Sequence, residues 1–481
     1  MDEINRIIAE GANAAMSLEE IIKLEVDEWL SSEERMWMLT GQRYYNGDHD
    51  ILYRKRTVIG EGGQLVEVQN LANNRLVHAF FRKLVDQKVG YLLGLAPSIQ
   101  ASNEQYQKLL EEILLSKSFL RTLMLLGREA IIKGKAWLHV YYDEKGRLSF
   151  RRIPAEEVIP LWRDASHTEL DAVIRVYEVE VYEGTTRKIE TKVEFWDTSG
   201  VRRYVLSEGG LIPDVEAGES ASHFTAVIDG QEQEFNWERV PFVCFKYNDD
   251  ELPLIRVLKT LIDEYDRRAS DMANTLEDLP NSIYVLRNYD GQDLGEFRRN
   301  LSVYRAVKVT DDGGVETLSL DIDTEAHKLH MERLRKDIYE FGRGVDTQTE
   351  RFGGDKSGVA LRFLYADLDM DANILETEFQ ASLEQLRWFI DKHIYNTTGR
   401  DYSSETVDII FSRDININET EVINNARASV GIISDETIVA NHPWVTNVQA
   451  ELERIRRQRE EELDRLGYNS LGGAGQEGDG E

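Results

Sequence analysis

Residues 324–398 most constrain the fold, because they predict one very long helical stretch that is interrupted once. The interruption is the polar, glycine-containing segment 346–357, after which the helical pattern resumes at Gly358 and continues to about Thr398. At about 1.5 Å per residue, a helix of roughly 40 residues is about 60 Å long, which exceeds the diameter of a small domain. An average helix has only about 11–12 residues. We therefore expect a strut in a larger assembly rather than part of a compact enzyme.

The charge balance and the cysteine content limit the classes of protein to which the chain can belong. Its 481 residues carry a formal net charge of −31, which disfavours phosphate contacts over most of the surface, because affinity for nucleic acid comes mainly from Lys and Arg. The single cysteine, Cys244, excludes an intramolecular disulfide and a four-cysteine metal site, and its apolar neighbours indicate a buried thiol. No signal-peptide pattern and no apolar stretch of about 18 residues is present, so we expect a soluble protein without a membrane partner.

Two short patterns resemble ligand sites, but each lacks a required residue. The segment 353–357 resembles a nucleotide phosphate loop, yet Asp355 stands where that loop needs a glycine before its lysine. The acidic run 321–332 has the spacing of a calcium loop, but Ala326 replaces the essential glycine and the run has a helical pattern. Two histidines three residues apart in that run have no further metal ligands near them. The sequence therefore predicts no cofactor, no metal ion and no catalytic residue.

The hydrophobic period changes several times along the chain and predicts an α+β fold. Helical periodicity dominates residues 1–46, and a period of two appears after Gly134. Helices are expected at 76–94, 104–133, 253–279, 324–345, 358–398 and 417–466, and strands at 135–142, 147–153, 172–182, 191–196, 201–206, 240–247, 282–287, 306–309, 315–320 and 404–414. Residues 207–236 are polar and contain glycine, so we expect an exposed excursion there.

Several short stretches have a characteristic order and spacing along the chain. They are Tyr44-Tyr-Asn-Gly47, Asn74-Arg75, Gly90-Tyr-Leu-Leu-Gly94, Leu261-Ile-Asp-Glu-Tyr265, Leu276-Glu-Asp278, Phe352-Gly353, Ser357-Gly-Val-Ala-Leu361 and Ile433-Ser-Asp-Glu-Thr437, the last before Pro443 and Glu451. Together they cover nearly the whole length. In these stretches the chain resembles the portal proteins, or head–tail connectors, of tailed bacteriophages, especially those of siphophages that infect Gram-positive bacteria.

This resemblance implies a portal fold of the α+β class and gives each region a name. The regions are a wing at 1–250 that continues as the long helix and strand at 358–416, stem helices at 251–280 and 323–345, a small α/β clip at 281–322, a tunnel loop at 346–357, a helical crown at 417–466 and a disordered acidic tail at 467–481.

The resemblance also implies a function and a set of partners. Portal subunits form a ring of about twelve, with thirteen possible when isolated, at a unique capsid vertex. The terminase motor pumps double-stranded DNA through this ring without sequence specificity, and the DNA leaves by the same channel. The implied partners are the terminase large subunit, the major capsid and scaffolding proteins and a head-completion adaptor. The protein would be located in the virion, and in the host cytoplasm during assembly. The ATPase belongs to the terminase, so no enzymatic activity is expected.

Three groups of residues are the candidate functional sites. The tunnel loop consists of Asp346, Thr347, Gln348, Thr349, Glu350, Arg351, Phe352, Gly353, Gly354, Asp355, Lys356 and Ser357. A basic cluster in the second stem helix, which either touches DNA or pairs with neighbouring subunits, consists of Arg333, Arg335 and Lys336. The expected docking residues of the clip are Asp293, Arg298 and Arg299.

The composition of the predicted tunnel loop favours movement. Glycines permit backbone angles that other residues resist, so we expect Gly353 and Gly354 to let the loop move, with Gly342 and Gly344 loosening its start. Lys356 is the expected phosphate contact, and the alternative is a solvated connection between helices. Twelve copies would carry roughly −370 charges, and such an acidic conduit should limit sticking of DNA.

Two rival interpretations stay open on the sequence. One is another oligomeric structural protein of the virion, a scaffold or an adaptor, although the strands expected within 135–247 argue against a pure coiled coil. The other is an acidic hydrolase whose catalytic carboxylates do not stand out among the many acidic residues.

Overall fold

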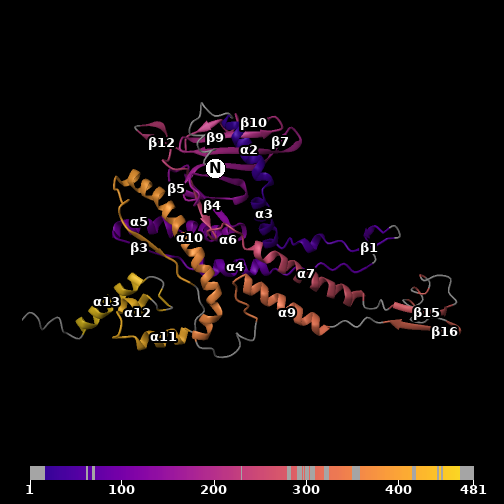
Figure 1. Ribbon diagram of the computed structural model, residues 1–481. Helices are drawn as coiled ribbons and strands as arrows, with labels where there is room; N and C mark the ends of the chain where they lie inside the picture. The colour runs from indigo at the N-terminus through magenta and orange to yellow at the C-terminus, as the bar shows by residue number, and fades with distance from the viewer. Residues whose placement is uncertain are drawn as a thin grey trace, which may run out of the picture. The chain divides into compact units, whose positions relative to one another are not determined.

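The computed structural model describes most of the chain in two compact units. The described residues are 17–60, 63–67, 71–228, 230–278, 283–289, 309–318, 324–348, 358–413, 419–440 and 448–465, together with residues 295, 297, 299, 303, 442, 444 and 445. The first unit comprises residues 1–346 and 367–413, and the second comprises residues 347–366 and 414–481. Helices and strands alternate in blocks along the chain, which confirms the predicted α+β class (Figure 1).

Polar side chains cap four of the five N-terminal helices, and the exception is the helix that follows Ala79. The five helices are α2 (Leu18–Ser31), α3 (Glu33–Tyr45), α4 (Phe80–Leu93), α5 (Glu104–Leu114) and α6 (Lys117–Lys133). Ser17 and Glu20 form a reciprocal capping box at the start of α2. The sequence pattern predicted one helix over 104–133, which is wrong. The chain breaks after Leu115, and the hydroxyl of Ser116 accepts the backbone N–H of Phe119 and so starts α6.

Two antiparallel sheets follow, and the larger one packs against α2. The three-stranded sheet has the order β14 (Phe242–Lys246), β4 (Lys135–Tyr142) and β5 (Leu148–Ile153). The six-stranded sheet contains β6 (Val158–Trp162), β7 (Leu170–Glu183), β8 (Thr186–Asp197), β9 (Gly200–Ser207), β10 (Gly210–Pro213) and β11 (Ser220–Ala221). Ile22 and Val26 of α2 are fully buried in one core with Val173 and Phe195 of this sheet.

The predicted excursion at 207–236 has more regular structure than its composition indicated. Besides β10 and β11 it contains the hairpin of β12 (Phe224–Ile228) and β13 (Gln231–Phe235). Polar residues can form a strand here because residues 231–234 of β13 are all exposed. The hairpin pairs its own two strands and joins no other sheet among the described residues.

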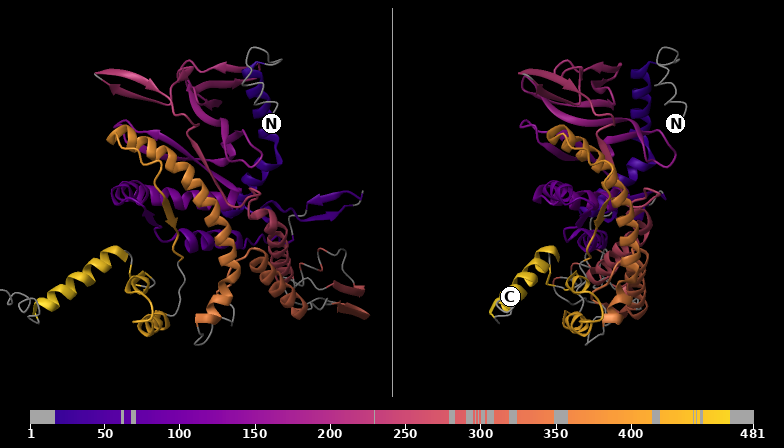
Figure 2. Two further views of the ribbon diagram at one scale, coloured as in Figure 1. Left: turned by 60° about the vertical axis from the view of Figure 1, so that its left-hand side comes forward. Right: turned by 90° about the vertical axis from the view of Figure 1, so that its left-hand side faces the viewer.

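A pair of long helices encloses a second β-hairpin. Helix α7 (Ile255–Asp278) packs against α9 (Thr324–Phe341), and the hairpin of β15 (Ile283–Tyr289) and β16 (Val309–Leu318) lies between them in the sequence (Figure 2). Two separate strands were expected at 306–309 and 315–320, and the single strand β16 replaces them, because it pairs continuously with β15 from Ile283↔Leu318 to Arg287↔Gly314.

Helix α10 (Gly358–Thr398) has 41 residues, as the sequence pattern predicted. Phe379, Leu386 and Ile390 are fully or almost fully buried. The hydroxyl of Ser382 donates to the carbonyl of Cys244 in β14 at 2.7 Å, and the rings of Phe379 and Phe245 meet edge to face with centroids 5.1 Å apart. The middle of α10 is therefore fixed to the three-stranded sheet.

The remaining elements are short. Strand β3 (Ser98–Ala101) pairs with β17 (Val407–Ile410), and β1 (Thr57–Ile59) pairs with β2 (Leu65–Glu67). The second unit contains α11 (Glu419–Ala428), α12 (Asp435–Ala440) and α13 (Val448–Arg465). Helix α12 has a side-chain cap, since the hydroxyl of Ser434 accepts the backbone N–H of Thr437 at 3.2 Å. None of the described helices is long and apolar enough to cross a membrane.

Helix α7 carries a row of buried polar side chains that bind an extended stretch of backbone. The side chains are four residues apart, so they lie on one helix face. Each accepts a backbone N–H, and the pairs are Asn74 with Asn274 at 2.6 Å, Leu76 with Ser270 at 2.9 Å and His78 with Asp266 at 2.8 Å. Donors two residues apart in an extended chain are separated by about 6.6 Å, and acceptors four residues apart on a helix are separated by about 6 Å. The spacing of the N–H groups therefore matches the spacing of the side chains on α7. We call these three hydrogen bonds the α7 ladder.

The α7 ladder explains where α4 begins. Apolar residues at helical spacing predicted a helix from Leu76, but residues 72–79 have no helical structure and α4 starts at Phe80. A helix over residues 74–78 would advance only about 6 Å, whereas the three acceptors from Asp266 to Asn274 span about 12 Å along α7. The ladder would then be lost, and Asp266, Ser270 and Asn274, all at most 4% exposed, would be left without these donors.

Removing one acceptor of the α7 ladder should destabilise the protein. Ser270→Ala leaves the part-buried N–H of Leu76 without its acceptor, and a buried unsatisfied donor costs about 1–3 kcal/mol of unfolding free energy. Chemical unfolding followed by circular dichroism measures this loss. The control is Thr275→Ala, an exposed position on the same helix whose hydroxyl bonds only to its own helix, for which a change below about 0.5 kcal/mol is expected. Equal losses in both variants would contradict the role of the ladder.

Candidate functional site

The turn that follows α9 leads into the predicted tunnel loop and is tightly packed. Arg343 has a positive φ of 47°, and a methyl group added at Gly344 would lie 2.1 Å from Cδ2 of Leu84 in α4. A methyl group added at Gly342 would lie 2.8 Å from the other terminal carbon of Leu84. The prediction that the two glycines loosen this end of the loop is therefore wrong. They allow the turn to pack closely on α4.

Two side chains fix the backbone at the end of this turn. The side-chain amide of Gln87 binds Val345 on both sides, donating to its carbonyl at 3.1 Å and accepting its N–H at 2.9 Å. The guanidinium of Arg335 donates two hydrogen bonds to the carboxylate of Asp346, at 2.6 and 2.8 Å. Such bidentate pairs are among the strongest polar contacts in proteins. The chain is consequently held up to Asp346, the first residue of the predicted tunnel loop.

A buried ion pair joins the same turn to α10. The ammonium of Lys88 lies 2.7 Å from Asp371 and donates to the carbonyl of Arg343 at 3.2 Å. The hydroxyl of Tyr247 donates to Asp371 at 2.9 Å. Burial lowers the pKa of Lys88, and the charge of Asp371 opposes this effect. Burial also raises the pKa of Tyr247, and the neighbouring Asp371 adds to the rise. These contacts tie α4, the end of β14 and α10 to the turn after α9.

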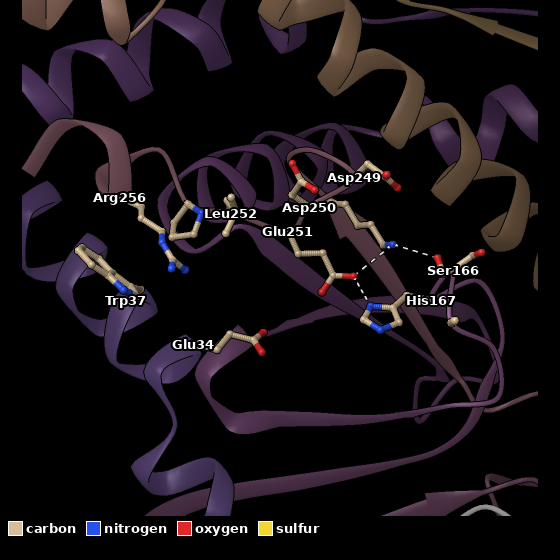
Figure 3. Close-up of a pocket in the computed structure, with 12 residues that line it drawn as sticks. Glu34, Trp37, Ser166, His167, Asp249, Asp250, Glu251, Leu252 and Arg256 are labelled. Carbon is tan, nitrogen blue, oxygen red and sulfur yellow. Dashed lines mark hydrogen bonds and ion pairs between the residues drawn. The ribbon is translucent and has the colours of Figure 1, made fainter. Parts of the chain in front are cut away.

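A second polar cluster surrounds Glu251 just before α7, beside a cavity of about 490 Å³ (Figure 3). Its carboxylate accepts hydrogen bonds from Lys135 and from Nδ1 of His167, both at 2.6 Å, and Lys246 lies 3.2 Å away. Burial alone would raise the pKa of Glu251, but Lys135 and its other partners lower it to about 2. A carboxylate so strongly ionised is suited to joining chain segments and not to proton transfer near neutral pH.

The cysteine and the described acidic residues give no sign of reaction chemistry. Cys244 is 6% exposed, and burial raises the pKa of its thiol, so the predicted buried thiol is confirmed and is unreactive in this state. Over the described ranges, no group of three or more His, Cys, Asp and Glu side chains is arranged to hold a metal ion.

The basic cluster predicted in the second stem helix divides into three different environments. Arg335 is engaged with Asp346, and its guanidinium lies 5.7 Å from the ring centroid of Tyr339. Arg333 is paired along its own helix with Asp337 at 2.8 Å, although its side chain is 67% exposed. Lys336 is exposed. Of the three, Lys336 has the most accessible charge and Arg335 the least.

The other predicted site residues are only partly covered by the structure. In the tunnel loop, Asp346, Thr347 and Gln348 are described, and Thr347 and Gln348 are exposed. Residues 349–357 lie outside the described residues. In the clip, Arg299 is exposed, whereas Asp293 and Arg298 lie outside the described residues. The roles assigned to these residues stay predictions.

The residues that hold the turn were not predicted from the sequence. Lys88 lies on the otherwise apolar face of α4, with Leu84 and Leu92 one turn away on either side, and a charged residue in such a stripe is a signal for a buried partner. The partner, Asp371, is 283 residues away in the sequence. Gln87 had no recognisable signal, because its partners are backbone atoms.

The ion pair of Lys88 and Asp371 should show strong energetic coupling. Asp371→Leu leaves a buried ammonium without its counter-charge and should lower the free energy of unfolding by about 3–5 kcal/mol. The double variant Lys88→Met, Asp371→Leu should regain about half of this loss or more, because an apolar pair can replace a buried ion pair. Chemical unfolding of both single variants and the double variant gives the coupling energy. Additive losses would show that the two side chains do not act as a pair.

Comparison with known proteins assigns the family. The family model described as phage portal protein, SPP1 Gp6-like, matches residues 31–464. The portal protein of Bacillus phage SPP1 is 30% identical over 460 residues, covering 95% of this chain and 90% of that protein. The portal protein of Clostridium phage phiCD119 is 34% identical over 432 residues, covering 86% of this chain and 91% of that protein.

Among solved structures there is a more distant likeness to the neck of the native GTA particle computed with C12 symmetry. Its TM-score is 0.40 at 11% sequence identity, and it covers 76% of this chain and 89% of the other. The two portal proteins match this chain over most of their own length, and the family model leaves only the chain ends unmatched. The chain therefore belongs to the SPP1 Gp6-like family of phage portal proteins, which confirms the resemblance drawn from its sequence motifs.

Proposed function

We propose that this chain is the subunit of a portal ring at one vertex of a tailed-phage capsid. In this proposal double-stranded DNA enters through the ring during packaging and leaves through it during ejection. The family match over residues 31–464 carries the proposal. The role is structural, and the energy for DNA movement comes from a separate terminase motor. The subunit resides in the virion and is present in the host cytoplasm while the capsid assembles.

The surface of the two long helices supports assembly. Val257 and Leu276 on α7 and Leu329 and Phe341 on α9 are each 57–59% exposed. Apolar side chains exposed along paired helices are commonly covered by a partner. We propose that a neighbouring copy of the chain covers them in a ring of about twelve subunits, with α7 and α9 as the stem and residues 358–416 completing the wing.

The segment 346–357 is proposed as the tunnel loop. Arg335, Gln87 and the close packing of Gly344 support this, because they hold the chain rigidly up to the first residue of the loop. In this proposal, movement would be confined to the residues after Asp346. Lys356 is proposed to contact DNA phosphates, and Lys336, which is exposed on α9, is the best candidate for a DNA contact within the stem.

Residues 281–322 are proposed as the clip, which docks other proteins of the packaging machinery. The hairpin of β15 and β16 between α7 and α9 supports this proposal, because an insert between two paired helices is placed at their far end. Asp293, Arg298 and Arg299 are the proposed docking residues for the terminase large subunit and later for the head-completion adaptor. The major capsid and scaffolding proteins are further proposed partners of the ring.

The ring is the first test of the proposed function. The purified chain should give a species of roughly twelve to thirteen times 55.4 kDa by light scattering, because exposed apolar helix faces associate. Electron microscopy of that species should show rings with a central hole. A chain that stays monomeric at high protein concentration and moderate salt would argue for a different structural role.

Phage with substitutions in the tunnel loop and phage with substitutions in the clip should fail at different stages of DNA packaging. Phage carrying Lys356→Glu, or Gly353→Pro with Gly354→Pro, should build normal rings and capsids but hold less DNA, since the loop loses its phosphate contact or its freedom to move. Phage carrying Arg298→Glu with Arg299→Glu should build rings but leave capsids empty, because the motor does not dock. Capsid DNA is measured by quantitative amplification of nuclease-protected genomes. Normal DNA content in the loop variants would mean that residues 346–357 are only a connection.

A further inference from the structure

Helix α13, labelled in Figure 1, is open to solvent along most of its length. It has 18 residues, and none of those whose side chains the structure describes is buried. Leu452 and Ile455 are partly buried, and Arg459 pairs with Asp435 of α12 at 2.9 Å. These three residues of α13 follow the spacing of one helix face. That face is turned toward α12, and most described side chains on the other faces are exposed.

The exposed part of α13 carries two pairs of opposite charges. Arg456 and Arg457 lie in one turn, and Glu460 and Glu461 lie in the next turn, each four residues beyond an arginine. Residues four apart are neighbours on a helix surface, separated by about 6 Å along its axis. All four side chains are exposed, and none of them has a hydrogen bond or ion pair with another described residue. We call the two pairs the basic turn and the acidic turn.

These charges are poorly placed for partners on their own helix. A glutamate that precedes a basic residue by four positions forms the better ion pair within a helix, and the order of the basic and acidic turns is the reverse. Carboxylates near the C-terminal end of a helix are also disfavoured by the helix dipole, and the acidic turn lies close to the end of α13 at Arg465. A basic group on a neighbouring molecule would offset both effects. The charge order of α13 therefore favours contacts outside its own chain.

The alternation of charge indicates a second copy of this chain as the partner. Helix α13 contains six acidic and five basic residues, a net charge of −1, whereas binding to nucleic acid needs a surplus of Lys and Arg. In a ring of identical subunits every interface is head-to-tail, so two different surfaces of the chain meet there. The basic turn and the acidic turn are two such surfaces, and their charges are complementary.

We propose that α13 of each subunit lies beside α13 of the next copy in the ring, displaced by about one helical turn, so that the basic turn of one copy faces the acidic turn of the other. Neighbours in a ring are related by a rotation, and helices inclined to the ring axis meet with such a displacement. This inference rests on the proposed function, because it assumes a ring of identical subunits. It adds a polar contact through α13 to the apolar contacts of α7 and α9.

Charge reversal of either turn should weaken the ring. Arg456→Glu with Arg457→Glu makes both turns acidic, and Glu460→Arg with Glu461→Arg makes both turns basic. Like charges then face one another at every interface, so we expect the protein concentration at which half of the chain is in rings to rise roughly tenfold in each variant at low salt. Mass photometry across a dilution series measures this, and circular dichroism checks that each variant folds.

The matched control is Lys108→Glu with Lys117→Glu, which changes the net charge as the arginine variant does, at two exposed positions outside α13. Its assembly concentration should stay within about threefold of the wild-type value, because no charge in α13 has changed.

A mixture of the two charge-reversed variants identifies the partner. It places an acidic copy beside a basic copy, and a ring of twelve can alternate the two, so the assembly concentration should return to within about threefold of the wild-type value. Ion pairs within one chain cannot produce this rescue, because each variant carries charges of only one sign on both turns. Failure of the mixture to recover, or an unchanged assembly concentration in both variants, would overturn the proposal.

Two further outcomes separate this inference from its alternatives. Normal assembly of the arginine variant together with weaker binding to a short DNA duplex would overturn the contact between copies and identify a nucleic-acid contact instead. If the wild-type chain forms no ring, the proposed function fails first. If it forms rings whose assembly does not depend on these four charges, the contact through α13 fails alone.

Discussion

The hydrogen bonds between the side chains of α7 and the backbone of residues 74–78 are the constraint on which much of the first unit depends. They place an extended segment against the polar face of a long helix and decide where α4 begins. Asp266 extends this contact, because its second oxygen binds the buried imidazole of His49 at 2.6 Å. Buried polar groups of this kind must all find partners, so the segment has only one register along the helix.

Three of the motif stretches that carried the family resemblance meet around this helix. Tyr44 donates to Asp263, which lies within Leu261–Tyr265, and Asn74 binds Asn274. The ring of Tyr265 meets that of His78 edge to face, with centroids 4.7 Å apart. Stretches separated by about two hundred residues in the sequence thus form one connected polar and aromatic network, which gives a physical reason for their common order and spacing.

Polar contacts from α4, α9 and α10 fix the chain at the junction after α9. Lys88, Gln87 and Arg335 fix the chain up to Asp346, and α10 is held to the sheet through its buried middle. In the proposed portal ring, this arrangement would keep the frame of each subunit constant while DNA passes. In that proposed ring, the net charge of −31 per subunit would limit the sticking of DNA phosphates.

The sequence by itself determined the features whose signals are local. These include the 41 residues of α10, five of the six strands between 135 and 207, since β6 was not expected, and the family. Only the tertiary structure decided that residues 74–78 are extended, that the glycines after α9 pack closely and that Arg335 is bound to Asp346. Periodicity and capping depend on neighbours within a few residues, whereas a backbone N–H whose acceptor lies about two hundred residues away leaves no local pattern.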